Sequence, residues 1–101
     1  MSAKLETKLM VNNTPIELNE FAHDYITRIA ICAVSMLKGG ADVRSLVFDL
    51  EGDKPSLVIN EKTVLLSAFP RDALVGTFTG MASSLRGVHE INRLQITIHA
   101  I

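Results

Sequence analysis

The sequence predicts an α+β fold in which two helices pack on one face of a mainly antiparallel (mixed) six-stranded sheet. Two observations support this class. Short segments with alternating apolar residues flank two long apolar stretches of helical length. The chain also aligns with itself without a gap when it is shifted by 48 positions, which places Leu9 on Leu57. Its 101 residues suffice for one core, so we expect a single domain over residues 1–101.

The self-alignment joins residues 9–51 to residues 57–99. It predicts an internal duplication of a ββαβ unit, with pseudo-repeats at about 8–51 and 56–99. The identical pairs are Leu9/Leu57, Asn12/Asn60, Leu18/Leu66, Phe21/Phe69, Asp24/Asp72, Ser35/Ser83, Leu37/Leu85, Gly39/Gly87 and Leu46/Leu94. Shared periodicity would align some leucines, but it would not bring turn asparagines and helix-ending glycines into one register.

The first copy opens with a predicted β-hairpin. Apolar residues alternate on both sides of Asn12-Asn13, a two-residue turn whose asparagines tolerate positive φ. Pro15 has no backbone N–H to donate. The second strand is therefore expected at an edge of the sheet, where no ladder bond is lost.

A helix and a third strand complete the first copy. Asn19 is placed to cap a helix through residues 20–38, and Gly39-Gly40 is expected to end it. Apolar residues then alternate from Leu46 to Leu50, as in a strand with one buried face. The second copy repeats this plan, with its helix at about Ala68–Arg86 and its last strand near residues 94–98.

The two predicted helices differ in bulk. The expected core face of the first helix carries Phe21, Tyr25, Ile29, Cys32, Ala33 and Met36. At the positions that match Tyr25, Arg28, Cys32 and Met36, the second helix has Ala73, Gly76, Gly80 and Ser84. Two mid-helix glycines are costly, so we predict that the first helix packs its bulky side chains, Tyr25, Cys32 and Met36, against this smooth strip. The alternative is a pocket for a small apolar or aromatic ligand, with Gly76, Gly80, Thr77 and Ser84 as its candidate binding residues.

Ile31 and Val34 fall on the opposite arc of the first helix and are predicted to point away from the core. Two neighbouring exposed aliphatic side chains on one helix suggest a contact surface. We therefore expect a homo-oligomer, with a twofold dimer as the first choice, or docking on a protein partner. Ordinary scatter of exposed apolar residues would also account for the pair.

The sequence offers no coherent set of catalytic groups. His23, His89 and His99 lack the short spacings of a zinc site, and Cys32 is the only cysteine. Cys32 lies in an apolar stretch without the basic neighbours that activate a thiol, so it is expected to fill the core. We predict no catalytic residues, no metal site and no cofactor, and we rank an enzyme formed at a subunit interface last.

Composition narrows the classes of partner. Lysine and arginine total 10 against 11 acidic residues, a balance that does not favour nucleic acid. The apolar runs are too short for a membrane-spanning helix, and the first residues lack a signal-peptide core. The expectation is a cytoplasmic, non-enzymatic protein that acts through self-association or partner docking by its first helix. The second hypothesis is a carrier or sensor of a small apolar ligand.

Overall fold

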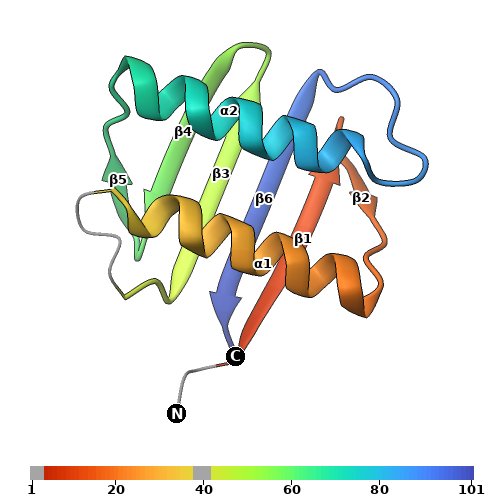
Figure 1. Cartoon of the computed structure of the whole chain (residues 1–101), viewed down its shortest axis with the longest axis horizontal. Coiled ribbons are helices and arrows are strands. Elements are labelled where there is room, and N and C mark those ends of the chain that lie inside the picture. The colour runs from red at the N-terminus through yellow and green to blue at the C-terminus, as the bar shows by residue number, and fades with distance from the viewer. Residues whose placement is uncertain (1–3, 38–41) are drawn as a thin grey trace.

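The computed structural model describes residues 4–37 and 42–101, and this part of the chain contains six strands and two helices (Figure 1). In chain order they are β1 (Leu5–Val11), β2 (Thr14–Ile16), α1 (Glu20–Ser35), β3 (Ser45–Glu51), β4 (Lys54–Ile59), β5 (Lys62–Val64), α2 (Ala68–Ser83) and β6 (Arg93–Ala100). The predicted α+β class is confirmed.

All six strands belong to one sheet, in the order β2-β1-β6-β3-β4-β5. Every neighbouring pair is antiparallel, so the sheet is not mixed. Both helices cross the same face of the sheet and leave the other face without a helix (Figure 1). The last strand, β6, therefore lies at the centre of the sheet between β1 and β3.

The core lies between the sheet and the two helices, because alternate residues of the long strands point to one face. The buried strand residues are Thr7, Leu9, Val11, Leu46, Phe48, Leu50, Leu57, Ile59, Leu94, Ile96 and Ile98. α1 adds Ile26, Ala30 and Val34, and α2 adds Leu74, Phe78, Met81 and Ala82. Phe48 and Phe78 meet edge to face with ring centroids 4.6 Å apart, a preferred aromatic geometry.

The helices, the short strands and the last strands of the two halves start 48 residues apart, and β1 and β4 start 49 residues apart. The helices begin at residues 20 and 68 and are both 16 residues long. The short strands begin at residues 14 and 62. Both residues of the turn after β1 have positive φ, as predicted for Asn12-Asn13, and so do both residues of the turn after β4. In the sheet, Leu9 pairs with Ile96 as Leu57 pairs with Phe48.

Asn12 and Asn60 fix these turns to a neighbouring strand with the same set of bonds. Asn12 Oδ1 accepts hydrogen bonds from the backbone N–H groups of Asn92 and Arg93 at 2.7 and 2.9 Å, and its Nδ2 donates to the Glu90 carbonyl at 2.7 Å. The corresponding partners of Asn60, at 2.7, 3.0 and 2.6 Å, are the N–H groups of Arg44 and Ser45 and the carbonyl of Asp42.

The helix start and the edge strand follow the sequence prediction, whereas the helix ends differ. Asn19 caps α1, since its Oδ1 accepts from the Ala22 N–H at 2.7 Å. Pro15 lies in β2 at an edge of the sheet. α1 ends at Ser35 and α2 at Ser83, three residues before the predicted ends. The predicted stop at Gly39-Gly40 lies outside the described residues.

Candidate functional site

Large apolar side chains are exposed on the outer side of the two helices. Phe21, Tyr25, Met36 and Phe69 have exposed fractions of 75, 51, 84 and 81%. The rings of Phe21 and Tyr25 stack, with centroids 5.8 Å apart. Scattered exposed side chains are normal in folded proteins, but neighbouring ones form a patch of the kind found at interaction sites.

We use the name helix-layer surface for the outward-facing residues of both helices and their ends. On α1 these are Phe21, Tyr25, Arg28, Cys32 and Met36, all exposed. The residues of α2 at the corresponding positions are Phe69, Ala73, Gly76, Gly80 and Ser84, also all exposed. The spacing of four, three, four and four residues keeps each set on one side of its helix.

The structure turns α1 relative to the prediction, so that of the predicted core face only Ile29 and Ala33 pack against the core. Tyr25, Cys32 and Met36 were expected in the core and are exposed, whereas Val34 is fully buried. Ile31 is half-buried at the margin of the buried arc, so these two residues do not form an outward patch. α1 is apolar around much of its circumference, which prevents periodicity from selecting one arc. The sheet packs against the side of α1 that carries smaller aliphatic side chains, and the side with the aromatic rings faces outward.

The small residues of α2 also lie outside the predicted helix–helix contact. Apart from its chain neighbours and the backbone of its own helix, a Cβ atom on Gly76 or Gly80 would have no heavy atom within 4 Å. Ala73 and Ser84 are exposed as well. The predicted packing of the bulky side chains of α1 against this strip is therefore wrong, because nothing packs on its two glycines and only Ala73 faces the end of α1.

The predicted ligand residues are divided between two hollows on either side of α2. Gly76 borders a hollow of about 560 Å³ that also includes the charged residues Asp53, Arg71 and Asp72. Thr77 instead lines a groove of about 390 Å³ between the end of α1 and the start of α2. The other residues of the groove are Ala33, Met36, Leu37, Phe69, Pro70, Ala73 and Leu74. Neither hollow is lined by Gly80 or Ser84, so the four residues do not form one pocket.

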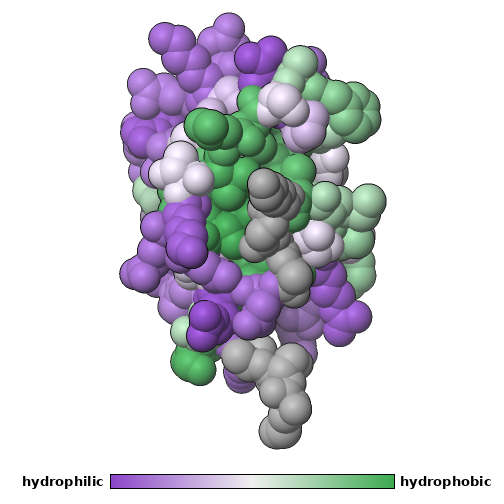
Figure 2. Space-filling model, turned by 90° about the vertical axis from the view of Figure 1, so that its left-hand side faces the viewer, coloured by the Kyte–Doolittle hydropathy of each residue, from purple (hydrophilic) through white to green (hydrophobic). Residues whose placement is uncertain are grey.

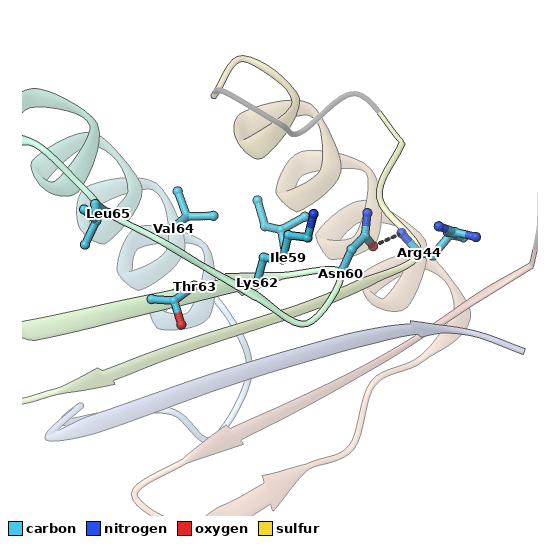
Figure 3. Close-up of a pocket in the computed structure, with 7 residues that line it drawn as sticks. All are labelled: Arg44, Ile59, Asn60, Lys62, Thr63, Val64 and Leu65. Atoms are coloured by element: carbon cyan, nitrogen blue, oxygen red, sulfur yellow. Dashed lines mark hydrogen bonds between the residues drawn. The ribbon is translucent and has the colours of Figure 1, made fainter.

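Apolar side chains also gather at one end of the molecule, where β5, the last turn of α1 and the first turn of α2 lie (Figure 2). A second hollow at this end, of about 590 Å³, lies beside the turn between β4 and β5 (Figure 3). Figure 3 shows Arg44 on the far side of Asn60 from Val64 and Leu65. Both polar atoms of the Asn60 side chain are already bonded within the chain, so Asn60 is not available to hold a ligand in this hollow.

His23 has a structural partner that the sequence did not indicate. Its Nε2 accepts a hydrogen bond from the Thr7 N–H at 3.0 Å, and its Nδ1 lies 3.0 Å from Asp24 Oδ1. Thr7 belongs to the part of β1 that β2 does not cover, so His23 satisfies an edge donor. Pro55 occupies the matching position of β4 and has no N–H to satisfy. This imidazole therefore has a structural role, because it ties α1 to the uncovered part of β1.

Arg93 forms the strongest charge contact on the sheet face without helices. Its Nε and Nη2 donate to the two carboxylate oxygens of Asp49 at 3.2 and 3.0 Å. The bond to Asp49 raises the pKa of Arg93 above its ordinary value, against a lowering by burial. The pair joins β6 to β3, and both charged side chains are thus satisfied within the chain.

The described residues contain no group of three or more histidine, cysteine or acidic side chains that could hold a metal ion. Cys32 is exposed on α1 and does not fill the core as predicted. Within residues 4–37 and 42–101, neither helix has the length and hydropathy needed to cross a bilayer.

Comparisons with protein-family models, curated proteins and solved structures find no significant match. The helix-layer surface carries four of the seven large apolar side chains that are exposed among the described residues.

Proposed function

We propose that the protein acts by self-association through the helix-layer surface, in the first instance as a twofold homodimer. The exposure of Phe21, Tyr25, Met36 and Phe69 on one side of the molecule carries the proposal. Burying one large apolar side chain contributes about 1.5–3 kcal/mol. Association itself costs about 4–15 kcal/mol, and a symmetric pair buries each of these four side chains twice. The apolar contribution that these side chains can make is therefore comparable with the cost of association.

The shapes of the two helices support a contact between α1 of one copy and α2 of the other. Tyr25, Arg28 and Met36 form a ridge on α1, and the corresponding positions of α2 bear side chains no larger than that of serine. A ridge of large side chains packs best into a groove of small ones. Under a twofold axis the contact between α1 and α2 would occur twice, as an isologous interface requires.

The two exposed glycines support the same arrangement. Each glycine inside a helix costs about 1 kcal/mol relative to alanine. Nothing within the described residues approaches Gly76 or Gly80 closely enough to require the absence of a side chain. A helix from a second copy, packed close to the α2 backbone, would account for both.

We further infer that the chain is a duplicated and fused ββαβ unit. The constant 48-residue offset of helices, turns and strand pairs supports this inference. The matched side-chain bonds of Asn12 and Asn60 support it as well, because periodicity alone would not reproduce them. On this account the two helices began alike and diverged, one becoming a ridge and the other a groove.

Sedimentation velocity from about 1 to about 100 µM tests the self-association, because this range detects a dimer whose binding free energy is about −8 kcal/mol or somewhat weaker. The expected result is a mass that rises from 11.0 kDa toward twice that value. A Phe21→Glu, Met36→Glu variant is expected to remain monomeric, since it places charges on the contact surface. Val47→Glu, on the opposite face of the sheet, is the matched control and should associate like the wild type.

Two outcomes would contradict the proposal. A wild-type mass of 11.0 kDa at every concentration would exclude self-association and leave docking on a different protein. Loss of association in Val47→Glu, together with normal association of the Phe21→Glu, Met36→Glu variant, would place the contact on the other face of the sheet.

The groove between the helices supports a second candidate function, the binding of a small apolar ligand. Its volume of about 390 Å³ is within the range of small-molecule sites, and nearly all of its lining is apolar. A fluorescent apolar dye such as an anilinonaphthalene sulfonate is a suitable probe. Binding that Ala73→Leu abolishes without loss of folding would support this function. Binding that competes with self-association would instead show that the groove belongs to the dimer contact.

A further inference from the structure

We propose that neither half of this chain forms a continuous sheet alone, because each half lacks one interior strand. A second copy of the chain can supply that strand when the two copies exchange halves. The first half spans β1 to β3 and the second spans β4 to β6. The strand order inserts β6 between β1 and β3, and β3 between β6 and β4. Each half therefore contains a slot, one strand wide, that the last strand of the other half fills.

The pairing within each half is small. The first half alone retains only the β1–β2 hairpin, whose second strand has three residues, and the second half retains only the corresponding β4–β5 hairpin. The long ladders, β1–β6, β3–β6 and β3–β4, all join one half to the other. An isolated two-stranded hairpin is marginal in water, so the inter-half ladders decide whether either half folds.

Side-chain contacts cross between the halves in the same way. Asn12, after β1, bonds to the start of β6, and Asn60, after β4, bonds to the start of β3. The Asp49–Arg93 pair joins β3 to β6. In the core, Phe48 of the first half packs on Phe78 of the second. Each half is thus the specific partner of the other.

One short connection makes these contacts intramolecular. Gly52 and Asp53 form the turn between β3 and β4, and Gly52 has a φ of +64°, which favours glycine. If this turn could not close, β3 and β4 would run on as one extended segment. Each half would then pair with the complementary half of a second copy and form every ladder of the monomer. Short hinge loops are a known route to such exchanged dimers.

Deletion of Gly52 and Asp53 from the full chain tests this proposal. It is made in the Phe21→Glu, Met36→Glu background, so that association through the helix-layer surface does not contribute. The expected product is a folded dimer of twice 11.0 kDa, with the circular dichroism of the parent. The control lengthens the same turn by four glycine and serine residues and should stay monomeric. A deletion variant that folds as a monomer would overturn the proposal.

A second measurement covers a deletion variant that fails to fold. A specific protease site is placed in the lengthened turn, and the purified, folded chain is cut there. The two fragments are expected to elute together from a sizing column without denaturant and to separate in denaturant. When the denaturant is removed, the mixed fragments should regain the circular dichroism spectrum of the parent. Fragments that separate without denaturant would overturn the interlocking of the halves. The proposed helix-layer contact could still hold in that event, because it does not depend on this turn.

Discussion

The side chains of Asn12 and Asn60 offer the sharpest test of how this sheet is held together. Replacement of Asn60 by alanine removes two accepted hydrogen bonds and one donated bond. These groups are partly exposed, so we take the low end of the usual range, about 0.5 kcal/mol for each bond. Asn60 also has a φ of +51°, and alanine in this left-handed region costs roughly 1 kcal/mol more. The expected loss is about 2.5 kcal/mol.

Two further variants separate the contributions. Asn60→Gly removes the same side-chain bonds but tolerates positive φ, so its expected loss is about 1.5 kcal/mol. Asn12→Ala is expected to match Asn60→Ala, because Asn12 has a φ of +52° and makes the corresponding three bonds.

Urea denaturation followed by circular dichroism measures these differences, provided that the slope of the transition is unchanged. A loss of about 2.5 kcal/mol would also lower the melting temperature by on the order of 10 °C in a domain of this size. A loss below about 0.5 kcal/mol in Asn60→Ala would refute the reasoning, since the turn would then be held without its side-chain bonds. Strongly unequal effects of Asn12→Ala and Asn60→Ala would refute the equivalence of the two turns.

Three other predictions follow from the same structure. Gly80→Ala should raise the stability of the monomer by about 0.5–1 kcal/mol, because the new methyl group meets open space, and it should weaken self-association. A monomer that is less stable in urea denaturation would contradict the exposure of this glycine. Val34→Asp should lower the free energy of unfolding by more than about 3 kcal/mol, because Val34 is buried, whereas Met36→Asp should change it by less than about 0.5 kcal/mol. Equal melting temperatures of the two variants would contradict the orientation of α1. His23→Ala should lower the free energy of unfolding by about 1 kcal/mol and speed hydrogen exchange at Thr7, because the Thr7 N–H loses its acceptor. Unchanged exchange would show that His23 does not protect this edge.

Local sequence signals predicted the strands, turns and helix starts well. Three of these features depend only on residues close together in the sequence, so they could be predicted from it. They are the Asn12-Asn13 turn, the Asn19 cap and the edge position of Pro15. Alternation along the strands likewise predicted which residues face the helices. The α+β class followed from these local features.

The orientation of the helices could not be predicted in the same way. α1 has apolar residues on both its buried and its exposed arc, so the choice between the arcs depends on the sheet below it and not on periodicity. Tyr25 and Met36 were assigned to the core because they are large and apolar, although the sheet packs against the smaller Ala30 and Val34. A comparison with α2 contained the missing signal, because its buried Leu74, Phe78 and Ala82 match Ile26, Ala30 and Val34 of α1.

Long-range pairings of single side chains were also beyond the sequence. The bond from Thr7 to His23 joins residues that periodicity places on different elements, and nothing near either residue indicates the other. The Asp49–Arg93 pair depends on the register of two strands that are adjacent only because β6 returns to the centre of the sheet. Strand order, which a single sequence does not specify, decides the contact between Asp49 and Arg93, and the placement of α1 beside β1 decides the contact between Thr7 and His23.

Cys32 provides the most direct test of the helix-layer surface, because it is exposed at the centre of the α1 ridge and is the only cysteine in the chain. The measurement is the rate at which its thiol reacts with a coloured disulfide reagent in dilute and in concentrated protein. If a second copy covers this ridge, the rate constant falls several-fold as the concentration rises, and it stays constant in the Phe21→Glu, Met36→Glu variant. Equal rate constants in a sample whose mass has doubled would place the contact elsewhere and contradict the proposed surface.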